Sequence, residues 1–185
     1  MNFNVIKTIH VLDKGGIVVA PTDTIYGVLG SALNKQTVER IYRVRARDTG
    51  KPCIVLVSHF AQIEQLGVNI SKNEKNILEN FWPGKISVVL ECNNKKFYYL
   101  HRGTKTIAFR MIGPRHKNLY YVLNKTGPLV APSANPQGFP PAKSINEAKK
   151  YFGEKIDVYV NGGIRNSKPS TLISILDGKT KILRN

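Results

Sequence analysis

Two patterns of apolar residues, helical spacing and short unbroken runs, alternate along the chain, and they predict an alternation of helices and strands. Apolar residues recur at helical spacing from Val5 to Leu12, and Gly15-Gly16 ends that predicted helix. Short unbroken apolar runs rich in β-branched residues predict buried strands. Further helices are expected at 35–44, 60–66, 71–81, 119–124 and 144–152. The expected strands are 17–20, 26–29, 53–57, 86–90, 107–111, 129–131, 158–160, 172–176 and 182–183.

This irregular alternation is typical of an α/β fold with a twisted, open, mixed sheet flanked by helices. A chain of 185 residues with 42% hydrophobic residues can bury one sizeable core, and we expect a single domain over 1–185. No internal repeat or low-complexity segment divides the sequence. No apolar run approaches the length needed to cross a membrane, which predicts a soluble, cytoplasmic protein.

Charge and cysteine content bear on what the domain binds. The chain has 28 Lys and Arg against 12 Asp and Glu, a net charge of +16 that favours a polyanionic partner. The charge is spread along the chain without a basic tail, so it indicates a positively biased surface. Cys53 and Cys92 have apolar or strand-like neighbours and are predicted to be buried free thiols. The four histidines show no ligand spacing, so no metal site is expected.

Candidate chemistry begins where the first predicted strand ends, at Thr22, Asp23 and Thr24. These residue types commonly hydrogen-bond nearby backbone, so taken alone they indicate an ordinary turn. A dense basic group then surrounds the end of the predicted helix at 35–44. It consists of Arg40, Arg43, Arg45, Arg47 and Lys51.

The basic group has two interpretations. If the chain leaves the helix in an extended conformation before Asp48, Arg45 and Arg47 lie on the same side, and their two guanidinium groups suit an oligophosphate. The alternative is a solvated basic face, because cations stabilise the C-terminus of a helix.

Two later strand ends also carry polar residues. Ser133 and Asn135 follow the predicted strand at 129–131, in the place where open α/β sheets bind ligands. The residue types of this segment are also those of an ordinary turn. Arg110 lies near the end of the core strand at 107–111 and needs an anionic partner if it is buried. A structural carboxylate and a ligand carboxylate suit it equally well.

A fourth candidate segment is 162–172, where glycines permit close approach and Ser170 and Thr171 precede a strand. The common motifs of nucleophilic, dinucleotide, P-loop and zinc-peptidase sites are missing from the sequence. Any chemistry is therefore expected to rest on positioning and charge neutralisation.

Five segments together resemble one family. They are Pro21-Thr22-Asp23-Thr24-Ile25-Tyr26-Gly27, Arg45-Ala46-Arg47, Trp82-Pro83-Gly84, Pro132-Ser133-Ala134-Asn135 and Pro169-Ser170-Thr171-Leu172. In this order and at these separations they resemble the YrdC/Sua5/TsaC family of threonylcarbamoyl-AMP synthases, over about 16–184. The length resembles the short, single-domain TsaC form. The resemblance implies an α/β twisted open sheet with a large basic concavity.

The resemblance also implies a reaction. L-threonine, bicarbonate or CO2, and ATP would give L-threonylcarbamoyladenylate and diphosphate, with Mg²⁺ expected on the phosphates. The product would supply the threonylcarbamoyladenosine modification of tRNA, through downstream threonylcarbamoyl-transfer proteins.

The motifs assign roles to individual residues. Arg45 and Arg47 would be catalytic, through their grip on the triphosphate. L-threonine would be held by Thr24, Arg110, Ala131 and Ser170. ATP would be held by Arg47, Lys51, Thr106, Ser133, Asn135, Pro141 and Arg184.

Three departures from the family pattern affect this interpretation. Arg45 stands where lysine is usual, Gln137 where serine is common, and Lys85 where an apolar residue or proline is usual. They leave open a relation to YciO-type paralogues. The competing function is a YrdC-like module that binds tRNA or double-stranded RNA without chemistry. Arg110 with Thr24 separates the two, because an RNA-binding module has no use for a small carboxylate subsite.

Overall fold

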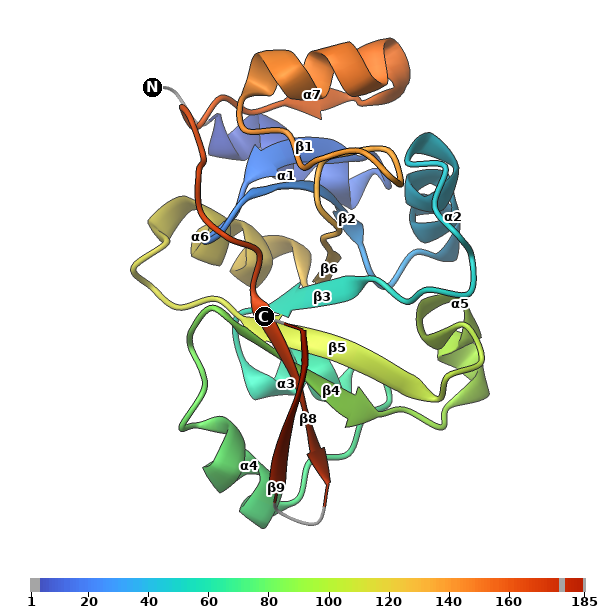
Figure 1. The fold of residues 1–185 in the computed structure, drawn as a ribbon, viewed down its shortest axis with the longest axis vertical. Coiled ribbons are helices and arrows are strands. Elements are labelled where there is room, and N and C mark those ends of the chain that lie inside the picture. The colour runs from blue at the N-terminus through green and yellow to red at the C-terminus, as the bar shows by residue number, and fades with distance from the viewer. Residues whose placement is uncertain (1–3, 177–178, 185) are drawn as a thin grey trace.

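The computed structural model describes residues 4–176 and 179–184, and it is organised around one mixed sheet (Figure 1). Within these residues the strands follow the order β7-β1-β2-β6-β3-β5-β4-β8-β9. Their bounds are β1 Val18–Pro21, β2 Tyr26–Ser31, β3 Ile54–Val57, β4 Ile86–Glu91, β5 Thr106–Met111, β6 Leu129–Val130, β7 Val158–Tyr159, β8 Thr171–Leu176 and β9 Lys179–Arg184.

Parallel and antiparallel pairs both occur in the sheet. Strand β3 runs parallel to β5, with Ile54 opposite Ala108, and β4 runs parallel to β8. The pairs β1–β2, β4–β5 and β8–β9 are antiparallel. The predicted α/β fold with a mixed sheet flanked by helices is confirmed.

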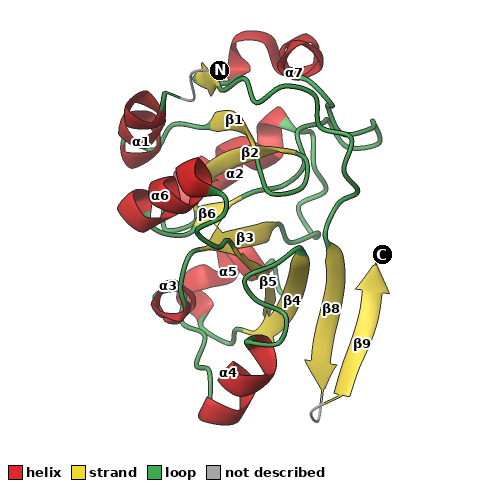
Figure 2. Cartoon of the chain, turned by 90° about the vertical axis from the view of Figure 1, so that its left-hand side faces the viewer, coloured by secondary structure: helices red, strands yellow, loops and turns green. Residues whose placement is uncertain are grey.

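Helices cover both faces of the sheet (Figure 2). Their bounds are α1 Val5–Asp13, α2 Lys35–Val44, α3 Phe60–Glu64, α4 Lys72–Leu78, α5 Tyr98–His101, α6 Lys117–Thr126 and α7 Ile145–Phe152. Two 3₁₀ turns lie at Lys95–Phe97 and Gly153–Lys155.

The alternation of side chains along β1 separates two hydrophobic cores. Val19 belongs to the core that also contains residues of α2 and α7, whereas Val18 and Ala20 pack with residues of α1 and α6. Successive side chains of a strand point to opposite faces, so β1 supplies both cores and is buried throughout. Its C-terminal end is thereby fixed where the Thr22–Thr24 turn begins.

The predicted elements agree with the structure except near residue 98. Strand and helix bounds differ by a few residues at most, and Ser71 and Ser144 cap α4 and α7 as their sequence positions suggest. The sequence predicts no helix at 98–101, where α5 lies, because four residues are too few to show a helical period. Its C-cap Arg102 stacks on the Tyr42 ring of α2 at 4.0 Å and pairs with Glu39 at 2.9 Å, which ties α5 to α2.

Two further expectations concern the whole chain. Cys53 and Cys92 are free and buried, as predicted. In the part of the chain that the structure describes, no helix combines the length and apolar character needed to cross a bilayer.

Candidate functional site

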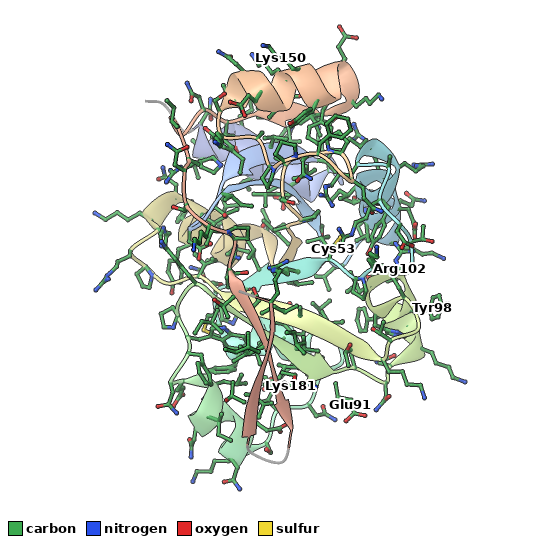
Figure 3. All side chains as sticks on the ribbon, in the orientation of Figure 1. Cys53, Glu91, Tyr98, Arg102, Lys150 and Lys181 are labelled. Carbon is green, nitrogen blue, oxygen red and sulfur yellow. The ribbon has the colours of Figure 1, made fainter. Side chains whose placement is uncertain are left out.

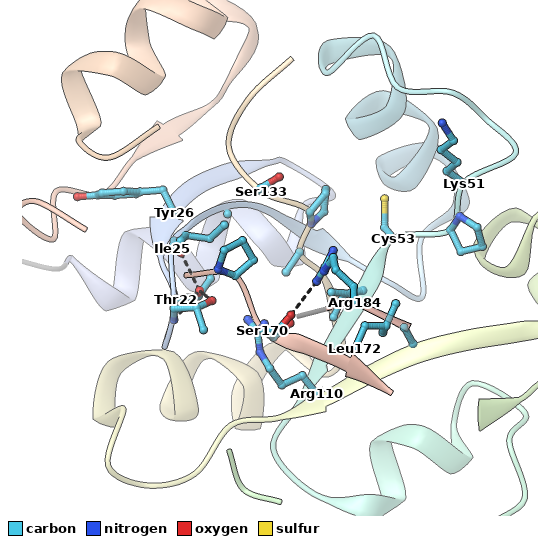
Figure 4. A pocket seen from close by; sticks show the side chains of 18 of the residues that line it. Thr22, Ile25, Tyr26, Lys51, Cys53, Arg110, Ser133, Ser170, Leu172 and Arg184 are labelled. Carbon is cyan, nitrogen blue, oxygen red and sulfur yellow. Dashed lines mark hydrogen bonds between the residues drawn. The ribbon is translucent and has the colours of Figure 1, made fainter. Parts of the chain in front are cut away.

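A cavity of about 340 Å³ lies where several strand ends meet, and most of the predicted site residues line it (Figure 4). Because β3 and β5 are parallel, their residues reach it side by side. The lining residues are Thr22, Thr24, Ile25, Tyr26, Gly27, Arg47, Lys51, Pro52, Cys53, Ile54, Ala108, Arg110, Ala131, Pro132, Ser133, Pro169, Ser170, Leu172 and Arg184.

Two threonine hydroxyls are fixed at one end of the cavity by the turn between β1 and β2. Thr22 Oγ1 donates to Ile25 O at 2.7 Å, and Thr24 N donates to Thr22 Oγ1 at 3.2 Å. The Thr22 and Thr24 hydroxyls lie 3.2 Å apart. The ordinary turn expected from these residue types is present, and it also presents Thr24 to the cavity.

Arg110 enters the cavity from β5 and is paired with a carboxylate of the same chain. Its Nη2 lies 2.9 Å from Asp23 Oδ1, and the two side chains are only 5% and 3% exposed. Burial lowers the pKa of Arg110, and the Asp23 charge opposes this effect. The structural partner that the sequence left open is therefore Asp23. Among the described residues, Arg110 Nε has no hydrogen-bond partner.

Arg45 differs from its predicted geometry. It adopts an αR conformation at the C-cap of α2, and Ala46 follows with φ of 47°, so the chain turns at once instead of extending. Arg45 Nε donates to Asn135 O at 2.9 Å, and Nη2 lies 3.3 Å from Ser133 Oγ and 3.4 Å from Asn135 Oδ1. Burial lowers the pKa of Arg45 to about 10.

The prediction of two parallel guanidinium groups facing a ligand is thus wrong. Arg45 does not line the cavity, whereas Arg47 and Lys51 do. Arg47 donates from Nε to Lys51 O at 3.0 Å and from Nη2 to Pro52 O at 2.9 Å. The Lys51 ammonium lies 3.5 Å from Asp48, with 64% of the Lys51 side chain exposed. Figure 4 shows Lys51 and Cys53 across the cavity from Thr22.

The segment after β6 contributes three cavity residues and one internal support. Ala131, Pro132 and Ser133 line the cavity. Asn135 is buried, and its Nδ2 donates to Pro136 O at 3.0 Å and to Phe139 O at 2.7 Å. Neither Asn135 nor Pro141 is among the lining residues. The Asn135 amide instead holds its own loop together.

Ser170 and Arg184 close the cavity from the strands at the other end of the sheet. Ser170 Oγ is buried 2.8 Å from Ser87 Oγ, and its carbonyl accepts from Arg184 Nη2 at 3.0 Å. Thr106 shares the face of β5 that carries Ala108 and Arg110, but lies beyond the lining residues, 3.2 Å from the Thr104 hydroxyl.

Several lining residues have no distinctive signal of a site in the sequence. Ile54 and Ala108 form part of the wall but look like ordinary strand residues in the sequence. Tyr26 was seen only as part of a motif, yet its hydroxyl accepts from Gly162 N and donates to Gly163 O, both at 2.8 Å. It thereby anchors the loop that leads to Ser170.

A second cavity, of about 400 Å³, lies behind Asp23. It is lined by Asp23, residues 83–85 and residues 111–116. In the described ranges, no three His, Cys, Asp or Glu side chains gather in a way that could hold a metal ion.

Known proteins share both the sequence and the fold. A threonylcarbamoyl-AMP synthase of Pyrococcus abyssi is 31% identical over 92% of this chain. The match covers only 50% of that longer protein. One from Marinobacter nauticus is 30% identical, and the match covers 89% of this chain and 87% of that protein. The structure of P. abyssi Sua5 complexed with L-threonine superposes with a TM-score of 0.87 at 28% identity, over 97% of this chain and 53% of that one.

A family model agrees with these likenesses. The Sua5/YciO/YrdC model, which carries the description telomere recombination, matches residues 10–185. The predicted family is confirmed: the chain belongs to the Sua5/YciO/YrdC family.

Proposed function

We propose that this protein is an L-threonylcarbamoyladenylate synthase, a nucleotidyltransferase that converts L-threonine, bicarbonate or CO2, and ATP into threonylcarbamoyl-AMP and diphosphate. The observation that carries the proposal is one cavity with two unlike ends. A deep arginine with hydroxyls lies at one end, and more exposed cations lie at the other. Relatives named for this activity and the threonine complex of P. abyssi Sua5 support it.

The deep end suits an amino acid with a small hydroxylated side chain. Arg110 would donate to the carboxylate, because its Nε has no hydrogen-bond partner among the described residues. Thr24 and Ser170 would supply hydroxyls, and the Ala131 backbone would close the subsite. Burial at this end favours strong polar contacts, since water screens them little.

The outer end suits a triphosphate. Arg47 and Lys51 place positive charge there, and Ser133 adds a hydroxyl. Arg184 lies between the two ends, since its Nη2 donates to Ser170 O at 3.0 Å, and it would reach the nucleotide from there. Arg45 would act by holding Ser133 and Asn135 in place, since its donors are directed at them. Thr106 and Pro141 would contact the nucleotide beyond the cavity itself.

The chemistry follows from this distribution of charge. A carbamate oxygen of the threonine adduct would attack the α-phosphorus, and diphosphate would leave from the opposite side. Two anions approach in this step, so cations that neutralise the phosphates lower its barrier.

Mg²⁺ would increase the neutralisation of the phosphates. The lining residues that the structure describes include no carboxylate, so the ion would be held by phosphate oxygens and water instead of side chains. The product would be passed to cytoplasmic proteins that modify tRNA.

The test is diphosphate release from ATP and bicarbonate with and without L-threonine. We expect release that depends on threonine and falls at least about tenfold with serine or glycine, because the threonine methyl and hydroxyl both contact a small subsite. Release that ignores the amino acid, or no release at all, would contradict the proposal.

RNA binding without chemistry remains the second candidate, and the net charge of +16 favours it. Basic side chains are not confined to the cavity: Lys150 on α7 and Lys181 on β9 lie far apart on the molecule (Figure 3). Such a distribution binds phosphate backbones through many weak contacts.

Arg110→Ala distinguishes the two functions. It should abolish threonine-dependent release and leave RNA affinity within about twofold, because Arg110 is buried and cannot reach an RNA backbone. Filter binding at two salt concentrations measures the affinity. An equal loss of both properties would show that one surface serves both.

A further inference from the structure

Asp23 is a buried charge that the proposed reaction does not use. It belongs to the turn between β1 and β2, and its carboxylate pairs with Arg110 at 2.9 Å. Arg110 lines the first cavity and Asp23 lines the second, so the ion pair forms part of the wall between them. Any ligand that contacts Arg110 in the first cavity therefore has Asp23 behind the guanidinium.

The two charges are placed where each strongly affects the other. Both side chains are almost completely buried, and charges in a protein interior are screened far less than on the surface. Asp23 Oδ1 contacts the guanidinium without an aligned hydrogen bond. The interaction is thus mainly one of charge, and the two charges of the pair nearly cancel. Arg184 adds a positive charge near the pair and lowers the pKa of Arg110, but it is unchanged when Asp23 alone is altered.

A neutral pair discriminates between ligands by their charge. A simple carboxylate is attracted by Arg110 but repelled by Asp23 behind it. The ammonium of an amino acid is attracted by Asp23 and offsets that repulsion. An arginine without a carboxylate behind it would instead favour any small anion, including inorganic phosphate or bicarbonate.

We propose that Asp23 makes the deep subsite selective for zwitterionic amino acids over carboxylates that lack an ammonium group. This inference rests on the proposed function, because it takes the deep end of the cavity as the threonine subsite. Asp23 acts through Arg110 and does not touch the substrate.

The first test uses the unaltered protein without ATP. Calorimetry compares L-threonine with 3-hydroxybutyrate, which has the same carbon skeleton and hydroxyl but lacks the amino group. Threonine is expected to bind at least about tenfold more tightly. Equal affinities for the two ligands would overturn the inference about Asp23 but not the proposed function. A failure to bind threonine would overturn both.

The second test changes the charge. Asp23→Asn keeps an oxygen near Arg110, and its threonine preference should fall to within about threefold, mainly because 3-hydroxybutyrate binds more tightly. Asp157→Asn is the matched control, since Asp157 pairs with Arg40 and lines neither cavity. It should keep the full preference.

If Asp23 had only a structural role, Asp23→Asn would weaken the binding of threonine and of 3-hydroxybutyrate alike. The ratio of the two affinities would then stay unchanged, and that result would overturn the inference. If that variant does not fold, Asp23→Glu decides. It retains the charge and should retain the preference, and a collapsed ratio in the folded Glu variant would contradict a role based on charge.

Discussion

At the scale of single residues, Arg45 shows how one backbone conformation redirects a side chain. The sequence places it beside Arg47 in a basic segment, but the positive φ of Ala46 turns the chain and separates the two. Arg45 is only 2% exposed and donates to the segment that contains Ser133 and Asn135. Under the proposed function, Arg45 would support the nucleotide end, and Arg47 and Lys51 would meet the phosphates.

The contribution of Arg45 can be measured with two substitutions. Arg45→Ala leaves two buried acceptors of Asn135 and the half-buried Ser133 hydroxyl without their donor, so the free energy of unfolding should fall by about 2 to 4 kcal/mol, and turnover should fall with it. Arg45→Lys should retain most of the stability and most of the turnover, because an ammonium has three donors for those acceptors. Urea unfolding and diphosphate release measure the two effects.

If Arg45→Lys lowers stability and turnover as much as Arg45→Ala does, the planar guanidinium group itself is required at this position. Arg43→Ala is a suitable control, because Arg43 is an exposed arginine in the last turn of the same helix.

At the scale of elements, one carboxylate ties α2 to the start of the sheet. Asp157 accepts two bonds from Arg40 of α2, at 2.6 and 2.9 Å, and one from Ile17 N at 2.7 Å. Burial raises the pKa of Asp157, but the hydrogen bonds from Arg40 and Ile17 outweigh it and hold the pKa below its usual value. This contact ties α2 to the backbone just before β1 and to the residue just before β7.

This contact predicts a dependence of stability on pH. A carboxyl group whose pKa is lower in the folded state stabilises the fold above its unfolded pKa of about 4. That contribution is lost as pH falls through the folded value. Asp157→Asn should therefore lower the free energy of unfolding by about 1 kcal/mol at pH 7, and the difference should shrink below about pH 4. Urea titrations at several pH values measure it, and a constant difference would contradict this account.

At the scale of the whole molecule, local patterns predicted most of the elements but not their neighbours. Apolar runs and caps are properties of a few consecutive residues, so the strands and the longer helices could be predicted. Sheet order depends on pairings such as β1 with β7 and β4 with β8, which leave no local signal. The family resemblance supplied the fold type but not these registers.

The candidate site, too, could be predicted from the sequence only in part. Thr24, Arg110, Ser133 and Ser170 could be identified because each polar side chain lies at or beside a strand end. The Arg110–Asp23 pair joins two segments far apart in sequence and could not be foreseen, although Arg110 alone indicated a buried anion nearby. The buried position of Arg45 was missed for the same reason, since its acceptors come from the segment after β6.

The wall of the first cavity joins Thr22, Arg110 and Arg184, which lie near the beginning, the middle and the end of the described chain. A unit of neighbouring residues cannot contain all three, and contacts between residues so distant in sequence form slowly. The cavity should therefore appear only when the sheet is complete from β1 to β9. A refolding chain would gain its helices first and its capacity to bind ligands last.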